Sequence, residues 1–457
     1  MPREPNTRLA DAMRRAGSSN TGLAARVRAI AQENGIALRC THVDVRRWLD
    51  GVAPRPATAQ FIAAALSSKI GSRLSLDDIG MGDAPASAVL EITLDYPSDG
   101  LGAGQRIHDL ARRELVEDGL ILGSAIAPGA WSQPMIGWLL SRAEPLRLRD
   151  DVRTSVGESD VRAIRATTQL FMKLDFQFGG GHARAALAEY YSHDVRPLLQ
   201  GVFTESVGRQ LFSAAAEVAQ LLGWTAYDVG RHGLAQRYLI QALRLAQEAG
   251  DRMMGGRLLS NMSHQATYLG NFDQAVQLAR AAQEGAKGRA SATTMALFLA
   301  MEARAYAGNG DDARCSRAFS LAEKSFERRN SADDPEWIGY FDAAELAGEG
   351  AHCFRDLRNP RIAQQFVSRA IELCGPEYAR TLAFVRLVQA ASFAHQREPG
   401  RAAEVAADAI GLAGSLKSQR YLRYIRDLSA ELELYASDAA VRAFGELVAE
   451  RYPALCR

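Results

Sequence analysis

The second half of the chain repeats a pattern of small and apolar residues at helical spacing. The small positions fall into five sets, which are Gly230, Ala235, Leu239 and Ala242; Gly270, Ala275, Ala279 and Ala282; Gly308 and Ala313; Ala363, Val367 and Ala370; and Ala402, Ala406 and Ala409. The first alanines of successive sets lie 40, 38, 50 and 39 residues apart. A period near 40 with turns between apolar stretches is typical of stacked helix pairs, whose small residues lie where helices cross closely.

The first eighty residues have the periodicity of several short helices. Apolar residues at intervals of three and four predict helices over residues 7–16, 23–33, 42–49, 57–70 and 74–80. Thr41 is a suitable N-cap for the third of these helices, and Asp50-Gly51 ends it.

The middle of the chain has weaker patterning. Residues 92–104 lack periodicity and predict a flexible loop, whereas residues 107–117 have the pattern of an amphipathic helix. The 23 uncharged residues of segment 119–141 have the length of a membrane span, but Pro128 and Pro134 interrupt them. This stretch therefore predicts two short buried helices around a proline-containing break.

Composition and charge narrow the function classes. Hydrophobic residues make up 47% and charged residues 23%, and the net charge of +1 creates no global attraction to nucleic acid or membrane. Residues 1–80, however, hold 12 Lys and Arg against 7 Asp and Glu, a local net of +5. The five cysteines form no CxxC pair and no apolar signal segment begins the chain, so we expect a cytoplasmic protein.

Catalytic and metal-binding patterns are missing from the sequence. It contains no HExxH, GxSxG or Walker-type motif, so we expect no enzymatic activity, cofactor or metal. The glycine run 179–181 has no following Lys-Ser/Thr and no preceding strand, which favours a helix–helix turn over a phosphate loop. His352 and Cys353 are adjacent on a predicted helix, where side chains diverge by about 100° and make poor joint ligands.

A family resemblance lies in the first eighty residues. It is carried by Asn20, Leu23-Ala24, residues 41–51 (THVDVRRWLDG), Pro54, Pro56 and the helix ending in Ala64-Ala65-Leu66. This pattern resembles the Xre (lambda-repressor-like) helix-turn-helix family, in which the third helix enters the major groove of DNA. The span from Leu23 to Trp48 is longer than is usual in that family.

The resemblance implies a set of DNA contacts by position. Base-facing residues would be Thr41, His42, Val43, Asp44 and Arg47, and backbone-contacting residues would be Asn20, Arg46 and Arg55. Val45 and Trp48 would point into the small core of the head. The chemistry agrees, because an arginine can donate a bidentate pair to guanine and a histidine can reach a base acceptor. An aspartate can accept from a cytosine amino group, although it repels phosphate.

A second resemblance concerns the repeats. Leu222-Gly223, Gly230, Ala235 and Ala242 fall at the spacing of the tetratricopeptide repeat (TPR), although a period above its usual length of about 34 residues implies longer helices. Segments 221–251 and 341–357 are similar to actinobacterial regulators that join an Xre-type head to such repeats, the NsdA-like developmental regulators. The RRNPP class of peptide-sensing regulators is similar in layout.

Helical solenoids present a concave face built by the first helix of each pair. Counted along the repeats, that face is expected to carry Gln220, Trp224, Tyr227, Asp228, His264, Tyr268, Phe298, Glu302, Tyr306, Glu345, His352 and Arg355. Mixed aromatic and charged side chains suit a peptide or a small polar ligand. The alternative is that these residues pack between neighbouring helices or against a partner subunit.

These observations predict an all-α protein in three parts. Residues 1–80 are expected to form an Xre-type helix-turn-helix domain, residues 81–160 a linker with packing helices, and residues 161–457 a TPR-like domain for sensing and dimerisation. The expected function is sequence-specific transcriptional regulation by a homodimer on double-stranded DNA, with a peptide, small-molecule or protein effector and no membrane contact. Alternatives are a TPR scaffold or adaptor that acts through protein–protein interaction without binding DNA, and a regulator without an effector.

Overall fold

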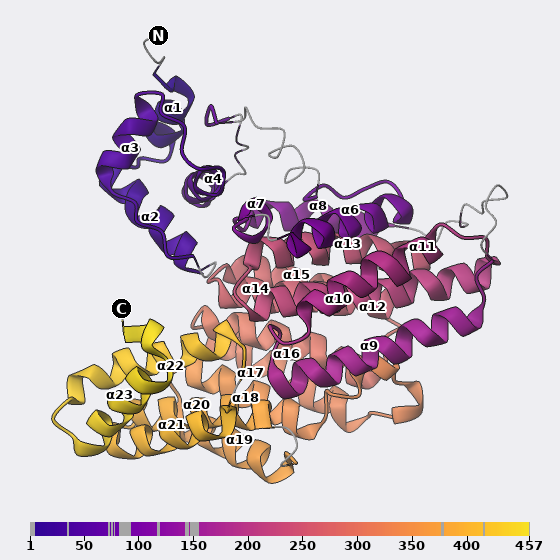
Figure 1. Ribbon diagram of the computed structural model, residues 1–457. Helices are drawn as coiled ribbons and strands as arrows, with labels where there is room; N and C mark the ends of the chain where they lie inside the picture. Colours follow the sequence, from indigo (N-terminus) through magenta and orange to yellow (C-terminus); the bar gives the residue numbers. More distant parts are fainter. Residues whose placement is uncertain are drawn as a thin grey trace. The chain divides into compact units, whose positions relative to one another are not determined.

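The structure is a computed structural model, and its regular elements are helices. It describes residues 5–33, 36–71, 74, 76, 78–81, 93–116, 119–141, 146, 155–375, 379–414 and 416–456. Within these ranges the helices are accompanied by an isolated bridge between Ser155 and Val202, which confirms the all-α prediction (Figure 1). The chain divides into two compact units: unit 1 comprises residues 1–168 and 183–258, and unit 2 comprises residues 169–182 and 259–457.

The first four helices of unit 1 form a small head. They are α1 (Thr7–Arg15), α2 (Asn20–Glu33), α3 (His42–Leu49) and α4 (Pro56–Ile70), drawn in indigo and purple in Figure 1. The bounds of α3 confirm the prediction for residues 42–49, while α2 begins three residues earlier than expected. The closing helix predicted over residues 74–80 lies partly outside the described residues.

An apolar core holds the head together. Val45 and Trp48 of α3 are buried against it, as predicted, together with Leu9, Leu23 and Ile62 from the three other helices. Burying an aliphatic side chain of this size stabilises a fold by about 1.5–3 kcal/mol. The core therefore fixes which side of α3 remains in contact with solvent.

The remainder of unit 1 is built around two long helices. Its elements are α6 (Gly100–Leu115), α7 (Gly119–Leu122), η1 (Pro128–Trp131), α8 (Ser132–Leu140), α10 (Arg184–Tyr190), the π-helix η2 (Tyr191–Val195), α11 (Arg196–Leu199), α12 (Glu205–Asp228) and α13 (His232–Ala249). Two further helices, α9 (Glu158–Phe178) and α14 (Arg252–Tyr268), belong in part to each unit.

The start of α6 lies where the sequence predicted a flexible loop. Asp99 accepts a hydrogen bond from the Gly102 N–H at 2.7 Å, and this cap begins the helix at Gly100. A Cβ at Gly100 would lie 2.8 Å from both Phe212 and Glu248. The loop prediction was therefore wrong for residues 100–104, because these glycines permit close packing rather than flexibility.

The uncharged stretch 119–141 forms short helices around a proline-containing break, as predicted, but they are only partly buried, since Ile136 is 50% and Leu140 75% exposed. Helices α7 and α8 flank η1, which begins at Pro128, and Trp131 and Trp138 are almost fully buried in unit 1. In the described ranges, no helix is both long enough and apolar enough to cross a bilayer.

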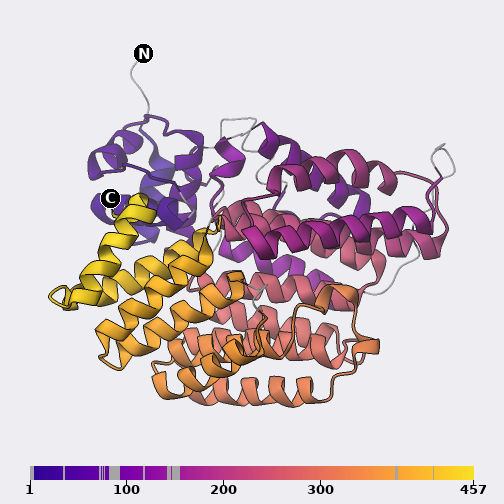
Figure 2. The same cartoon turned by 60° about the horizontal axis from the view of Figure 1, so that its bottom comes forward.

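Unit 2 continues with helices that run in pairs. They are α15 (Phe272–Gly285), α16 (Ala292–Gly308), α17 (Asp312–Glu327), η3 (Ser331–Asp333), η4 (Glu336–Ile338), α18 (Ala343–Asp356), α19 (Pro360–Leu373), α20 (Ala379–His395), α21 (Pro399–Ala413), α22 (Gln419–Leu432), η5 (Glu433–Tyr435), α23 (Ala439–Arg451) and η6 (Pro453–Cys456). Figure 2 shows them following one another side by side, from orange to yellow. The glycine run 179–181 forms a turn as predicted, with the Gly181 N–H donating to the Lys417 carbonyl at 3.3 Å.

One type of turn recurs between the helices of successive pairs. Each of these turns joins the two helices of one pair, from α12 and α13 to α20 and α21, and contains a residue with positive φ. In the described residues, the positive-φ residues of these turns are Gly230, Gly270, Gly310, Arg358 and Arg397. At each turn the next residue donates its N–H to the carbonyl five residues earlier, at 2.8 to 3.0 Å, as in a Schellman motif. These positions lie 40, 40, 48 and 39 residues apart, which confirms a helical repeat region.

The third pair differs in register from the prediction. Ala313 is exposed, and the buried small position is Cys315, five residues after the turn residue Gly310. Gly308 instead ends α16, where a Cβ would lie 2.4 Å from the ring of Phe272. The expectation for Ala313 was wrong because the true turn glycine lies two residues further along the chain.

Candidate functional site

Helix α3 presents a polar face to solvent. Val45 and Trp48 are buried, whereas Thr41, His42, Val43, Arg46 and Arg47 are exposed, and Val43, Arg46 and Arg47 lie on the side of the helix opposite the buried pair. Among the described residues, neither Arg46 nor Arg47 has a hydrogen-bond or ion-pair partner for its side chain. Both guanidinium groups are therefore free to contact a ligand.

Asp44 has a structural task at the start of α3. Its Oδ2 accepts hydrogen bonds from the Thr41 backbone N–H at 2.8 Å and from the Thr41 hydroxyl at 2.9 Å. These bonds, together with attraction to Arg47, lower the pKa of Asp44 because they favour the charged carboxylate. Contacts of Thr41 and Asp44 with bases would compete with this cap.

Both ends of α3 are fixed by neighbouring segments. The Asn6 N–H donates to the Leu49 carbonyl at 2.9 Å, at the end of the helix. Before the helix begins, Arg28 on α2 donates to the Cys40 carbonyl at 2.5 Å. These bonds help to hold α3 in place on the head.

The other predicted DNA-contacting residues lie at helix starts. Asn20 is the first residue of α2 and is half-buried, while Arg55 is the exposed residue that precedes α4. Helix N-termini favour phosphate groups because their backbone N–H groups are unpaired and the helix dipole is positive there. The eight predicted DNA-contacting residues thus all belong to the head: six lie at or beside the starts of α2, α3 and α4, and Arg46 and Arg47 lie in the last turn of α3.

The predicted groove residues of α12 pack within unit 1. Gln220, Tyr227 and Asp228 are at most 3% exposed. The rings of Trp224 and Tyr227 meet edge to face with centroids 5.5 Å apart. In the structure these side chains have a packing role.

The predicted groove residues of α16 also pack against neighbouring helices. Phe298 is fully buried, and Glu302 accepts a hydrogen bond from Arg280 Nε on α15 at 2.8 Å. The Tyr306 ring lies near two guanidinium groups, 5.9 Å from that of Arg280 and 5.7 Å from that of Arg314. These contacts join α16 to α15 and α17.

A cavity of 380 Å³ in unit 2 collects several of the other predicted groove residues. His264, Tyr268 and Arg355 line it, with further walls from α16, α20 and α22. His352 lies beside it, with Nδ1 3.2 Å from the hydroxyl of the lining residue Tyr424. The volume of the cavity is within the range of small-molecule sites, roughly 300–1,000 Å³.

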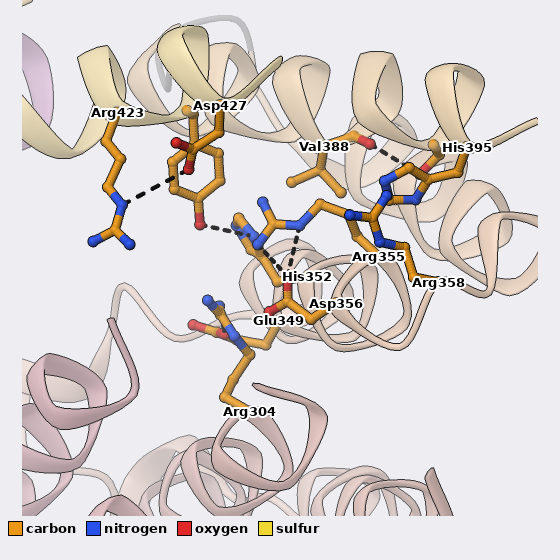
Figure 3. Close-up of polar contacts among 12 residues, drawn as sticks. Arg304, Glu349, His352, Arg355, Asp356, Arg358, Val388, His395, Arg423 and Asp427 are labelled. Carbon is orange, nitrogen blue, oxygen red and sulfur yellow. Dashed lines mark hydrogen bonds and ion pairs between the residues drawn. The ribbon is translucent and has the colours of Figure 1, made fainter. Parts of the chain in front are cut away.

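Charged side chains from three helices meet at this cavity. Figure 3 shows Arg304 pointing up from α16, Arg423 and Asp427 pointing down from α22, and Arg355 on α18 between them. Arg304 Nη1 donates to Glu349 Oε2 at 2.6 Å, and both side chains are at most 10% exposed.

The ion pairs of α18 and the turn after it complete the walls. Arg355 Nε and Nη2 donate to Asp356 Oδ1 at 2.8 and 2.5 Å, and its guanidinium lies 4.7 Å from the Tyr424 ring centroid. Arg358 Nη2 lies 3.0 Å from Glu431 Oε1. The second carboxylate oxygen of Glu431, Oε2, lies 3.2 Å from His395 Nε2. An arginine has five N–H groups in a planar fork, so these pairs leave further donors.

Several titratable groups near the cavity are perturbed by burial. Burial lowers the pKa of both His264 and His352 well below its usual value, and nearby arginines add to the effect, so both imidazoles are neutral at pH 7. Burial together with repulsion from Glu349 and Asp342 raises the pKa of Glu345 to about 8. Glu345 therefore adds little negative charge at neutral pH.

The sequence carried one signal for the cavity that the groove prediction did not use. Polar side chains at Arg420, Arg423, Tyr424, Asp427 and Glu431 follow the spacing of one helix face on α22 and line the cavity. Of the buried stripe of the same helix, Tyr421, Ile425, Leu428 and Leu432, Leu428 also lines the cavity. The groove prediction used residues between Gln220 and Arg355 and therefore did not include α22, which lies further along the chain.

Comparison with known proteins gives a match for the head. Residues 9–82 match the family model described as the SP15 N-terminal domain, and this segment contains all but the first two residues of α1, and all of α2, α3 and α4. No curated protein matches the chain significantly. The head is thus similar to that domain, and a long all-helical region follows it.

Proposed function

We propose that the chain is a sequence-specific DNA-binding regulator of transcription. The observation that carries this proposal is the exposed face of α3, where Val43, Arg46 and Arg47 lie opposite the buried Val45 and Trp48 and His42 is exposed beside them. A short helix that projects polar side chains from a compact head suits the major groove. The resemblance to Xre-type heads and the local net charge of +5 over residues 1–80 support the same interpretation.

The exposed residues of the head differ in the DNA groups, bases or phosphates, that their side chains are suited to contact. Arg47 lies one turn after Val43 and is suited to a bidentate pair with guanine, and His42 is suited to a base acceptor. Arg46, Arg55 and the start of α2 at Asn20 are suited to phosphates, which fix position without reading sequence. Asp44 keeps its capping role at the start of α3.

A homodimer is part of the proposal. One head of this size covers a single half-site, and joining two heads raises affinity through effective concentration. The helical repeat region offers the surface for joining two copies and for an effector.

Selection of duplexes from a random pool by the purified full chain tests the proposal. We expect enrichment of a motif with two half-sites. On that motif, Arg47→Ala should cost roughly 1–3 kcal/mol of specific binding and little non-specific binding. Arg289→Ala is the matched control, because it removes the same charge from an exposed site in unit 2 and should leave binding unchanged.

The outcomes separate the alternatives. An equal loss on every sequence would assign Arg47 to a phosphate rather than a base. A pool that shows no enrichment would favour the scaffold hypothesis, in which the repeats bind a protein partner and the head contacts no DNA.

A further inference from the structure

The cavity of unit 2 carries a surplus of positive charge. Among its described lining residues are five arginines, Arg304, Arg355, Arg358, Arg420 and Arg423, and three carboxylates, Asp356, Asp427 and Glu431. Glu349, which pairs with Arg304 from outside the lining, reduces the surplus to one positive charge. A concave site with a surplus of positive charge attracts anionic ligands.

Two buried nitrogens at the cavity lack partners in the part of the chain that the structure describes. Arg304 Nε has none, although the Arg304 side chain is only 8% exposed. His395 Nδ1 has none either, and its side chain is also 8% exposed. A buried polar group without a hydrogen bond is unfavourable, so a ligand that satisfies these groups would recover that free energy.

We propose that this cavity binds a small organic phosphate, which deepens the effector part of the proposed function. The donors come from α16, from α18 with its following turn, and from α22, and a phosphate offers three strong acceptor oxygens that guanidinium groups recognise well. Tyr268, Phe272 and Leu428 supply an apolar surface for the organic part. Inorganic phosphate alone would leave that surface and most of the 380 Å³ unused.

Isothermal titration calorimetry on the full chain without DNA tests this inference. The probes are inorganic phosphate, ribose 5-phosphate, adenosine 5′-monophosphate and uncharged adenosine. We expect at least one of the two organic phosphates to bind more tightly than inorganic phosphate and adenosine. A preference for the nucleotide assigns the ligand to that class, and equal binding of ribose 5-phosphate assigns it to sugar phosphates.

Three variants locate the binding site. Arg304→Lys keeps the charge beside Glu349 but removes Nε, and it should weaken binding by about tenfold or more, the effect of one lost hydrogen bond to a charged group. Arg358→Gln, at the exposed rim of the cavity, should also weaken binding. If Arg304→Lys does not fold, Arg358→Gln tests on its own whether the ligand binds in this cavity. Arg361→Gln, exposed on α19 and outside the lining, should leave affinity unchanged.

The inference is overturned if no organic phosphate binds, or if adenosine or inorganic phosphate binds as tightly as both of them. An equal loss in Arg361→Gln would also overturn it. Because no DNA is present, failure here leaves the proposal for α3 untouched, and failure of DNA binding leaves this result untouched.

Discussion

A buried ion pair in unit 1 gives a prediction whose size follows from its contacts. Arg184, just after the glycine run, donates from Nη2 to Glu114 Oε2 at 2.8 Å and also contacts Glu114 through Nε. Its Nη1 donates to the Leu222 carbonyl at 2.6 Å and to the Thr225 hydroxyl at 2.7 Å. The Arg184 and Glu114 side chains are 7% and 5% exposed, so solvent screens this pair little.

Arg184→Met removes all of these donors and leaves the Glu114 carboxylate buried. Breaking a buried pair in this way costs about 3–5 kcal/mol. Two partners of Glu114 remain, Arg231 at 3.5 Å and the Tyr238 hydroxyl at 3.0 Å, so we expect a loss near the lower end, about 3 kcal/mol.

Urea unfolding of the full chain, followed by hydrogen exchange of peptides from α6, α10 and α12, measures this loss. Arg162→Met is the matched control, because the Arg162–Glu158 pair is 73% and 67% exposed and such pairs contribute about 0–1 kcal/mol. If Arg184→Met unfolds with the same free energy as Arg162→Met, the assignment of Arg184 as a buried structural charge is refuted.

Three further predictions concern the cap of α3, a carboxyl with a raised pKa and a strained turn. Asp44→Ala removes the acceptor for Thr41 and should cost about 1 kcal/mol of head stability, seen as faster hydrogen exchange in α3. Glu345 has its pKa raised from 4.5 to about 8, so the folded chain retains a proton that the unfolded chain loses, and stability should fall as pH rises through this window. Glu345→Gln should flatten that slope in urea unfolding, and an unchanged slope would contradict the assignment. Arg397→Gly should gain up to about 1 kcal/mol, because Arg397 has a φ of 62° that glycine adopts without strain; a lower melting temperature would count against this.

Local patterns were sufficient to predict the head and the repeat. The N-cap Thr41 and the terminator Asp50-Gly51 are adjacent to the helix they delimit, and α3 has the predicted bounds. The period near 40 was visible because each turn needs a residue with positive φ followed by a small buried position. Such signals lie within a few residues of the feature they determine.

Features that depend on packing between distant segments were harder to predict. Gly100 resembled a flexible loop residue, yet its lack of a side chain makes room for Phe212 and Glu248, which lie far along the chain. Arg358 occupies a turn position with positive φ, where glycine is the usual residue, so the turn could not be recognised by residue type. Local sequence does not determine contacts of this kind.

The candidate groove was only partly predictable for the same reason. His264, Tyr268 and Arg355 line the cavity, but Phe298 and Glu302 lie on the other side of α16 from Arg304. A shift of two residues on a helix rotates a side chain by about 200°, so a small error in phase exchanges one face for the other.

The central claim is that the exposed face of α3 binds duplex DNA. The most direct measurement is fluorescence anisotropy of a labelled mixed-sequence duplex titrated with the full chain at low ionic strength and then with increasing salt. The account predicts binding at low salt and a linear fall of log affinity with log salt concentration, as phosphate contacts release counterions. Absence of binding to every duplex at low ionic strength would contradict it.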